Sequence, residues 1–222
     1  MEKQTRFQKI MHDVLPLSFK EEVFNAITHG VMAIAMLILL PISAIYTYIH
    51  YDVIRTIGVC IFIICLYLMF FSSTLYHSME FSSPQKAIFR ILDHSCIYLA
   101  IAGSYTPVAL CIIRGWQGIV VLIIQWTMVV AGILYKSIST KSLPKLSLTI
   151  YLIMGWTALM FIPSLISNSS LMFMIFIVLG GVMYSIGAVF YAMHNLKYSH
   201  VIWHFFIVVA SIFHYIAIVF YM

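Results

Sequence analysis

Long apolar stretches alternate with short polar ones along most of the chain. No Asp, Glu, Lys or Arg lies between Glu22 and Asp52 or between Arg55 and Glu80, and the same holds from Asp93 to Arg114 and from Arg114 to Lys136. A membrane-spanning helix needs about 20 mostly apolar residues. Each of these four stretches therefore predicts one such helix.

The stretch from Lys145 to Lys197 is also free of charged residues, and it is long enough for two helices. The run Ser167-Asn168-Ser169-Ser170, preceded by Pro163, predicts the break between them. The residues after Lys197 form a last helix. The pattern thus predicts an all-α, integral membrane bundle of seven transmembrane helices, with residues 1–21 as an N-terminal tail and residues 22–222 as a single domain.

Composition supports a membrane protein. Hydrophobic residues make up 63% of the chain and charged residues 9%, whereas a soluble domain carries about 25% charged residues. The first 22 residues are charged and mixed, and the apolar run after them is too long for a cleaved signal, so we expect the first helix to be retained. The four cysteines lie in apolar segments without a C-x-x-C pair, which indicates small buried side chains rather than disulfides.

Lysines and arginines are distributed unevenly about the predicted helices. Ten lie in the N-terminal tail and in the second, fourth and sixth connections, against two, Arg55 and Arg114, on the opposite side. The ten are Lys3, Arg6, Lys9, Lys20, Lys86, Arg90, Lys136, Lys141, Lys145 and Lys197. Because basic residues favour the cytoplasmic side, we expect a cytoplasmic N-terminus and an extracytoplasmic C-terminus. This distribution explains the net charge of +5 without nucleic-acid binding.

Four polar side chains, His77, Asp93, His200 and His204, interrupt the apolar segments. A central Asp in a membrane helix costs roughly 2.5–3.5 kcal/mol on insertion scales, so such residues usually have partners. His77 is expected near the cytoplasmic end of the second helix, Asp93 in the first turns of the third, and His200 and His204 in the first two turns of the seventh. All four are therefore predicted at one depth, in the cytoplasmic half of the bundle.

These residue types suit a metal centre. His200 and His204 are four residues apart, so both rings project from one helix face. Three imidazoles hold a zinc ion and leave a fourth position for water, which predicts Zn²⁺ bound by His77, His200 and His204. Asp93 is then expected to orient or deprotonate that water, and Ser73, one turn before His77, to hydrogen-bond a developing oxyanion.

Other interpretations of these residues remain open. A lone histidine in a membrane helix is more often a hydrogen-bonded bundle residue than a ligand. Asp93 is also suited to pair with Arg90 or with a helix N-terminus, and Ser73 to bond the backbone of its own helix.

The remaining histidines are expected outside the metal site. His29, with Asn25, is interpreted equally well as a group supporting the ligands or as a cap at the cytoplasmic start of the first helix. His94 and His214 are interpreted as packed or hydrogen-bonded structural residues. The other three, His12, His50 and His194, are expected to be solvated at loops or helix ends.

Four spaced motifs resemble those of a known family. They are EEVFNAITHG at residues 21–30, STLYH at 73–77, LDH at 92–94 followed by GSYTP at 103–107, and SHVIWH at 199–204. Together they resemble the bacterial hemolysin III proteins, within the progestin and adipoQ receptor family that includes the adiponectin receptors. The resemblance covers nearly the whole chain, in the family's order of motifs.

The resemblance implies a seven-helix bundle in the bacterial plasma membrane with an inward N-terminus and zinc near the cytoplasmic face. By motif, His77, His200 and His204 correspond to the zinc ligands, Asp93 to the residue that holds the zinc-bound water, and Ser73 to a neighbour of that site. The family is also grouped with alkaline ceramidases in a proposed superfamily of membrane metal-hydrolases.

Three functions are compatible with the sequence. The first is a zinc-dependent hydrolase of an amide or ester bond in a membrane lipid that enters laterally between helices. The second is a non-enzymatic sensor or receptor-like regulator of membrane homeostasis, with structural zinc. The third is a haemolytic membrane protein, although a pore needs polar side chains along its whole length and the outer halves of these helices offer only scattered ones.

Overall fold

The computed structural model of the 222-residue chain describes residues 6–11, 16–81, 83–139, 143–193 and 196–222. Four residues interpreted from the sequence, Lys3, His12, Lys141 and His194, lie outside them. The described part is helical and contains no strand. Seven of its helices are long and apolar enough to cross a membrane, which confirms the predicted all-α fold and the number of spans.

The spans follow the predicted order. They are α2 (Phe19–His50), α3 (Val53–Ser78), α4 (Pro84–Val108) with its π-helical end (Ala109–Ile113), α5 (Gly115–Ile138), a broken fifth span, α8 (Leu171–Ala192), and α9 (Ser199–Ile216) with its π-helical end (Ala217–Tyr221). The broken span consists of α6 (Pro144–Trp156), a 3-10 turn (Thr157–Phe161) and α7 (Ile162–Asn168). A short helix, α1 (Arg6–Met11), precedes them.

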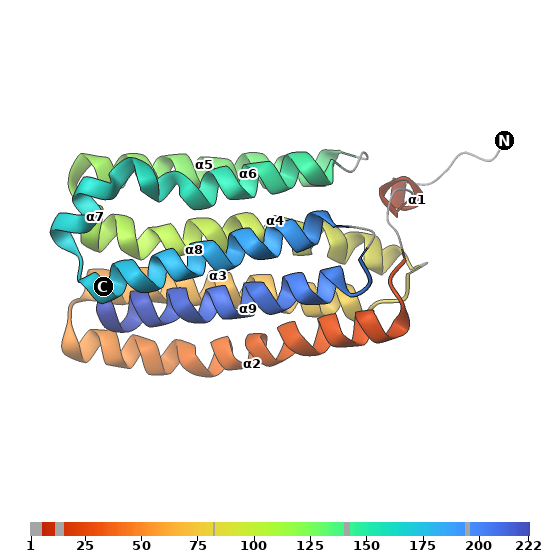
Figure 1. The fold of residues 1–222 in the computed structure, drawn as a ribbon, viewed down its shortest axis with the longest axis horizontal. Coiled ribbons are helices and arrows are strands. Elements are labelled where there is room, and N and C mark those ends of the chain that lie inside the picture. The colour runs from red at the N-terminus through yellow and green to blue at the C-terminus, as the bar shows by residue number, and fades with distance from the viewer. Residues whose placement is uncertain (1–5, 12–15, 82, 140–142, 194–195) are drawn as a thin grey trace.

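The spans run side by side along the long axis of the molecule (Figure 1). In that view α5 and α6 form one outer layer and α2 the opposite one, with α3, α4, α8 and α9 between them. The main packing pairs are α2 with α3, α3 with α4, and α8 with α9. The end at which α2, α4, α6 and α9 begin, next to α1, is called the α1 end here, and the opposite end the far end.

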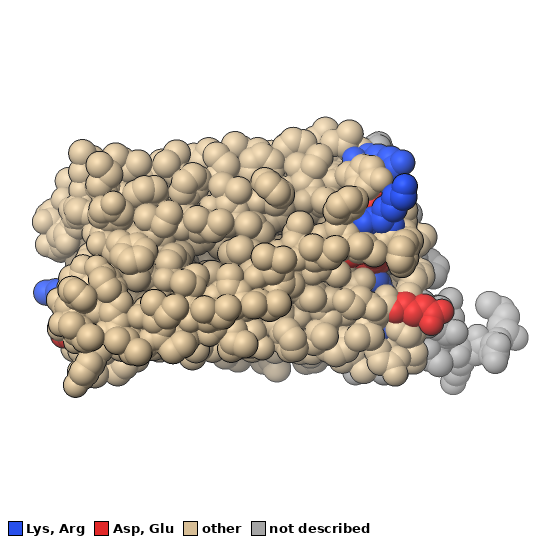
Figure 2. Space-filling model, turned by 90° about the horizontal axis from the view of Figure 1, so that it is seen from below, with Lys and Arg blue, Asp and Glu red and all other residues tan. Residues whose placement is uncertain are grey.

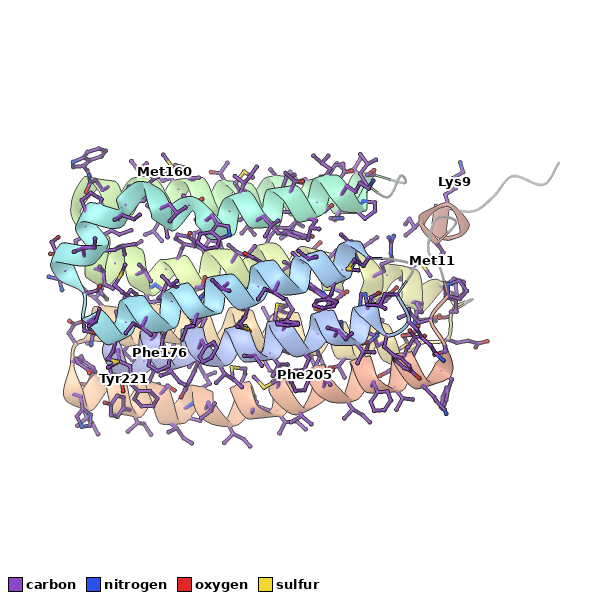
Figure 3. The ribbon with its side chains drawn as sticks, in the orientation of Figure 1. Lys9, Met11, Met160, Phe176, Phe205 and Tyr221 are labelled. Carbon is purple, nitrogen blue, oxygen red and sulfur yellow. The ribbon has the colours of Figure 1, made fainter. Side chains whose placement is uncertain are left out.

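The sides of the bundle are apolar and its charges lie at the ends. Figure 2 shows lysine, arginine and acidic side chains gathered at the α1 end, with a broad uncharged surface along the helices. Many large apolar residues on the sides are more than half exposed, among them Ile34, Ile123 and Met160, and Met160 points away from the bundle in Figure 3. At the far end, Phe176 of α8 stacks on Tyr221 with the ring centroids 5.5 Å apart. This surface is that of a multi-pass membrane protein, whose apolar sides meet lipid.

The start of the first span is fixed by a capping box. The backbone N–H of Glu21 donates to the Ser18 hydroxyl, and the Glu21 carboxylate accepts from the Ser18 backbone N–H at 3.0 Å. Such a reciprocal pair satisfies N–H groups that the first turn leaves unpaired. Consequently α2 begins at Phe19.

The start of the third span differs from the expectation. Ser83 caps α4 and Pro84 is its first residue, so Asp93, expected in the first turns, lies in the third turn. Lys86 and Arg90, assigned from the sequence to a connection, lie within this helix. The charge-based boundary was wrong because Lys86 is buried in the bundle with a carboxylate partner. The predicted break between the fifth and sixth spans is confirmed: α7 ends at Asn168 and Ser170 caps α8.

Candidate metal centre

Three histidines predicted as metal ligands lie together at the α1 end. His77 is in the last turn of α3, and His200 and His204 are in the first two turns of α9. Each offers a ring nitrogen, and the three atoms lie within 4.8 Å of one another. The ring centroids are 4.8–5.1 Å apart. The structure therefore brings the predicted ligands to one level, while metal binding itself stays a prediction.

A local contact places the first turn of α9. Tyr198, which precedes this helix, adopts a left-handed backbone conformation with φ of 62°. Its backbone N–H donates to Glu21 Oε1 at 3.0 Å. A non-glycine residue in this region is strained by on the order of 1 kcal/mol or more, so a specific contact must hold it there. The bond ties the start of α9 to the start of α2 and thereby sets the position of His200.

The nitrogens fit a small divalent ion. His77 and His204 are buried, and within the described residues His77 Nε2 and His204 Nδ1 have no hydrogen-bond partner. A zinc–nitrogen bond of about 2.0–2.1 Å corresponds to nitrogens about 3.4 Å apart in a tetrahedral site. Closing the observed triangle to that size needs a shift of about 1 Å or less for each ring. Three neutral imidazoles are donors that zinc, copper, iron and nickel accept.

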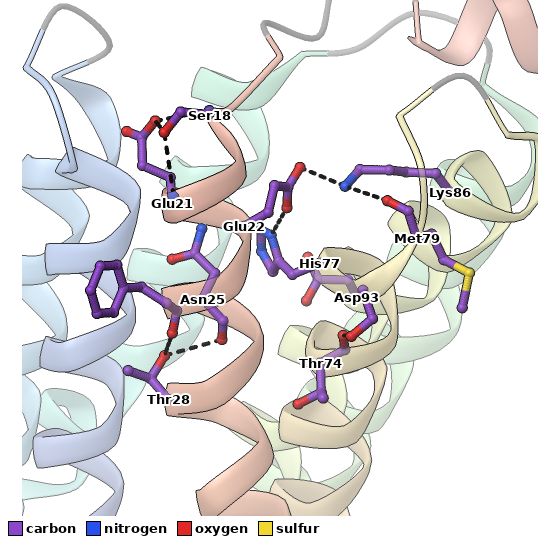
Figure 4. Close-up of polar contacts among 12 residues, drawn as sticks. Ser18, Glu21, Glu22, Asn25, Thr28, Thr74, His77, Met79, Lys86 and Asp93 are labelled. Atoms are coloured by element: carbon purple, nitrogen blue, oxygen red, sulfur yellow. Dashed lines mark hydrogen bonds and ion pairs between the residues drawn. The ribbon is translucent and has the colours of Figure 1, made fainter.

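Glu22 and Lys86 complete the surroundings of His77, a role that no pattern in the sequence indicated. His77 Nδ1 lies 2.7 Å from Glu22 Oε2, and Lys86 Nζ donates to Glu22 Oε1 at 2.6 Å (Figure 4). Lys86 is 1% exposed. In the sequence, Glu22 marked a helix boundary and Lys86 a cytoplasmic charge. Only the packing of α2 against α3 and α4 makes them neighbours.

Asn25 and His29 lie on the following turns of α2 and are buried against the histidines. The His29 ring stacks on that of His204, with centroids 3.6 Å apart and planes 6° apart. Neither side chain caps the helix, because Ser18 caps α2 and both residues lie beyond its first turn. Among the described residues, neither the His29 nitrogens nor the Asn25 amide atoms have a hydrogen-bond partner. Of the two interpretations, the structure thus favours support of the ligands.

Asp93 and Ser73 are both buried at the same end of the bundle. The Asp93 carboxyl lies beside the Ser73 hydroxyl, and Asp93 Oδ2 is 3.7 Å from His94 Nδ1. In the described residues Asp93 is outside the group of three potential ligand atoms. Its proposed role toward a water molecule stays a prediction.

Ser73 differs from the residues on either side of it. Ser72 and Thr74 donate to carbonyls of their own helix, at 3.1 and 2.8 Å. The Ser73 hydroxyl has no backbone carbonyl partner within the described part of the chain, unlike the alternative interpretation, in which it bonds its own helix. It lies instead beside the Asp93 carboxyl.

The other described histidines contact backbone carbonyls, which agrees with the structural interpretation of His94 and His214. His94 Nδ1 lies 2.8 Å from the Arg90 carbonyl oxygen, and His214 Nε2 lies 3.3 Å from that of Ile177. His50 is exposed at the end of α2, with Nδ1 2.9 Å from the Tyr46 carbonyl oxygen.

An apolar cavity of about 420 Å³ lies between α4, α6, α8 and α9. Trp203, which directly precedes His204, lines it near the α1 end, together with Ile97, one turn after Asp93. Leu165 and Phe173 line it near the far end. From Phe173 to Ala188, another lining residue, α8 rises by about 22 Å. The cavity is thus long, apolar and adjacent to the helix that carries two of the histidines.

Comparison with known proteins gives consistent matches. The family model described as "Haemolysin-III related" matches residues 17–215. Hemolysin-3 of Bacillus cereus is 37% identical over 202 residues, which cover 91% of this chain and 92% of that protein. The hemolysin-3 homolog of Bacillus subtilis (strain 168) is 35% identical, with coverage of 92% and 95%. Human monocyte to macrophage differentiation factor is more distant, at 25% identity over 226 residues, with coverage of 97% and 92%.

Proposed function

The chain belongs to the haemolysin III family of membrane proteins, and from this premise we propose that it is a metal-dependent hydrolase of an amide or ester bond in a membrane lipid. One observation carries the proposal. Three histidine nitrogens lie within 4.8 Å of one another at the α1 end of the bundle, which also holds the buried Asp93 and Ser73, and a long apolar cavity is lined by Trp203 of α9.

The metal-binding residues of this proposal are His77, His200 and His204. Zinc is the proposed ion, because three imidazoles form the ligand set of hydrolytic zinc sites that keep one open position. A bound zinc ion supplies Lewis acidity, which polarises a carbonyl and makes water a stronger acid. The orientation of the chain, and hence the cytoplasmic location of the site, is part of the proposal.

The protein supplies the proton transfer and part of the charge stabilisation. Asp93 acts as the general base that takes the proton of the attacking water and returns it to the leaving nitrogen or oxygen. The Ser73 hydroxyl donates a hydrogen bond to the carbonyl oxygen as negative charge develops on it. Burial of both residues strengthens these interactions, because few water dipoles screen them.

The cavity supports a lipid substrate. Its walls are almost entirely apolar, and its length suits an extended acyl chain. Trp203 belongs both to this wall and to the turn that carries His200 and His204, so a chain in the cavity directs its polar end toward the histidines. The substrate then enters from the surrounding membrane rather than from water.

Metal content tests the site. Purified protein is expected to contain about one zinc ion per chain, and His200→Ala to lose it. His50→Ala is the matched control, because His50 is exposed and bonded to the backbone of its own helix. Equal metal content in all three proteins, or none in the wild type, would contradict the proposed ligand set.

Turnover tests the reaction. Ceramides, other acyl amides and phospholipids are offered in mixed vesicles, and fatty acid release is measured. Asp93→Asn is expected to keep its metal and to lose about 10²–10⁴-fold in rate, the usual contribution of a general base. A zinc-loaded protein that cleaves none of these lipids, and whose melting temperature falls on chelation, supports a sensor with structural zinc instead.

The name of the bacterial relatives refers to haemolysis. If lysis by this protein follows from lipid cleavage, dye release from vesicles is lost in Asp93→Asn. Leakage that survives this substitution and the ligand substitutions would favour a pore.

A further inference from the structure

We propose that Glu22, itself held by the buried Lys86, is a positioning residue that fixes His77 in the tautomer able to bind a metal. The inference rests on the proposed metal site and goes beyond it, because it assigns a role to two residues that are not ligands. It follows from a chain of contacts that joins α2, α3 and α4 (Figure 4).

The first step is the contact between His77 and Glu22. A neutral imidazole carries its proton on one nitrogen, and a carboxylate only accepts hydrogen bonds. Since His77 Nδ1 lies 2.7 Å from Glu22 Oε2, the proton belongs on Nδ1. The lone pair is then on Nε2, which is buried and has no hydrogen-bond partner in the described residues. Glu22 therefore leaves the lone pair of His77 on the nitrogen that has no other partner, where a metal can bind it.

The second step is the position of Lys86. Its Nζ donates to Glu22 Oε1 at 2.6 Å and to the Met79 carbonyl oxygen at 3.1 Å, and lies 4.7 Å from the centroid of the Tyr76 ring. A buried ammonium is costly unless it is paired and hydrogen-bonded, and these three contacts meet that condition. Met79 caps the C-terminus of α3, two residues after His77. Lys86 thus holds both the carboxylate and the end of the helix that carries the ligand.

The two oxygens of the Glu22 carboxylate have different partners, which distinguishes this arrangement from a simple ion pair. One oxygen of Glu22 is bound by Lys86 and the other faces His77, so the lysine sets the plane in which the carboxylate meets the imidazole. A carboxylate behind a ligating histidine orients the ring and increases its basicity, and its loss typically lowers metal affinity 10–100-fold. A structural ion pair would join α2 to α4 without affecting metal affinity.

The test compares Glu22→Gln, Lys86→Met and the double variant. Zinc affinity is measured on full-length protein in detergent by competition with a chromophoric chelator. Glu22→Gln is expected to bind zinc 10–100-fold more weakly than the wild type. The glutamine amide has one acceptor oxygen, so its NH₂ group must face either Lys86 or His77, and each of these needs an acceptor. In the double variant the amide oxygen is left to His77 alone, so most of the affinity is expected to return.

Asp52→Asn is the matched control. It makes the same acid-to-amide change at the far end of the bundle, where Asp52 caps α3 and accepts a hydrogen bond from the Arg55 backbone N–H at 2.8 Å. Asparagine is an equally good N-cap, so the start of α3 is preserved. The zinc affinity of this variant is expected to equal that of the wild type. Melting temperatures of the metal-free proteins show which variants are folded.

A second measurement reports on His77 directly. The ¹⁵N shifts of its imidazole in metal-free protein distinguish the two tautomers. The wild type is expected to show the proton on Nδ1, and Glu22→Gln a mixture of tautomers. A merely structural ion pair would change the melting temperature and leave the tautomer unchanged.

The outcomes separate this inference from the metal site itself. Wild-type affinity and an unchanged tautomer in Glu22→Gln would overturn the positioning role while the metal site stands. If the double variant binds zinc as weakly as Glu22→Gln, the role of Lys86 is wrong. If the wild type binds no zinc, the proposed function fails at its metal, and the tautomer measurement alone decides the role of Glu22.

Discussion

The two ends of α9 carry the same residue type in different surroundings. His204, near its start, is buried, its Nδ1 has no hydrogen-bond partner in the described residues, and its ring lies against those of His29, His77 and His200. His214, near its end, contacts the Ile177 carbonyl and packs edge-on against Tyr184. The Ile177 carbonyl oxygen lies beside His214 Nε2, whereas His204 Nδ1 has no such partner in the described residues and is available to the proposed metal. The neighbouring residues, rather than the histidine itself, distinguish the candidate ligand from the structural residue.

The contrast extends to the whole bundle. At the α1 end the buried polar groups include charged residues, and several have no partner among the described side chains. Toward the far end, several buried polar groups bond in neutral pairs, such as Ser43 with Tyr215 at 2.7 Å and Tyr184 with Ser211 at 2.8 Å. Arg55, whose buried Nη1 has no partner among the described residues, is an exception there. Satisfied neutral pairs join helices, while unsatisfied groups are costly to bury and indicate a binding site.

Removing His204 and His214 in turn is expected to give the largest effect. His204→Ala should reduce bound zinc from about one ion per chain to near zero, because two remaining imidazoles hold zinc poorly. His214→Ala should keep the metal and lower the melting temperature, because it leaves the carbonyl contact and the packing against Tyr184 unfilled. Elemental analysis and thermal melts measure both. Metal loss in both variants would show that the two ends are not independent.

Substitutions at two glycines test the structural role of His214 through the free energy of unfolding. A Cβ at Gly180 of α8 would overlap the His214 ring, whereas a Cβ at Gly155 of α6 meets no atom within 4 Å. Gly180→Ala is therefore expected to cost about 1–3 kcal/mol in the free energy of unfolding, as overpacking does. Gly155→Ala, the control, should be neutral or slightly stabilising, and neither should change metal content. Denaturant titrations in detergent provide the measurement.

The sequence predicted those features that depend on neighbours along the chain. Charge-free stretches gave the spans, because each span is one continuous run of residues. The spacing of His200 and His204 predicted that both rings project from one helix face. The expected direction of each helix predicted that His77 lies at the same depth. The start of α4 was wrong, since an interior lysine was interpreted as a loop residue.

What the sequence missed depends on packing between helices. The contact of Glu22 with His77 joins residues on α2 and α3, and that of Glu22 with Lys86 joins α2 to α4. Nothing in the local pattern around any of them signals the partner. The cavity was equally hidden, because it is bounded by side chains from several helices that are apolar in any case. Stacking of His29 on His204 required the packing of α2 against α9.

A larger side chain at Gly155 tests whether the cavity holds the acyl chain of a lipid that is cleaved at the α1 end. This glycine lines the cavity and has open space where a side chain would begin. Gly155→Leu is expected to reduce cleavage of long-chain lipids about tenfold relative to short-chain ones, since each methylene excluded from an apolar pocket costs about 1–3 kcal/mol. Fatty acid release from a series of chain lengths is measured, with Gly155→Ala as control. An equal loss at every length would contradict a role of the cavity in holding the chain.

The smallest expected effect lies between α8 and α9. Tyr184 and Ser211 share one hydrogen bond of 2.8 Å, and such bonds between membrane helices contribute about 0.6 kcal/mol on average. Tyr184→Phe and Ser211→Ala should each destabilise the bundle by roughly that amount, and the double variant by little more than either single one, because both remove the same bond. Zinc affinity should be equal in all of them, since the pair lies about two turns from His204 along α9. A change in zinc affinity would mean that α9 transmits packing changes to the histidines, and that its two ends act as one unit.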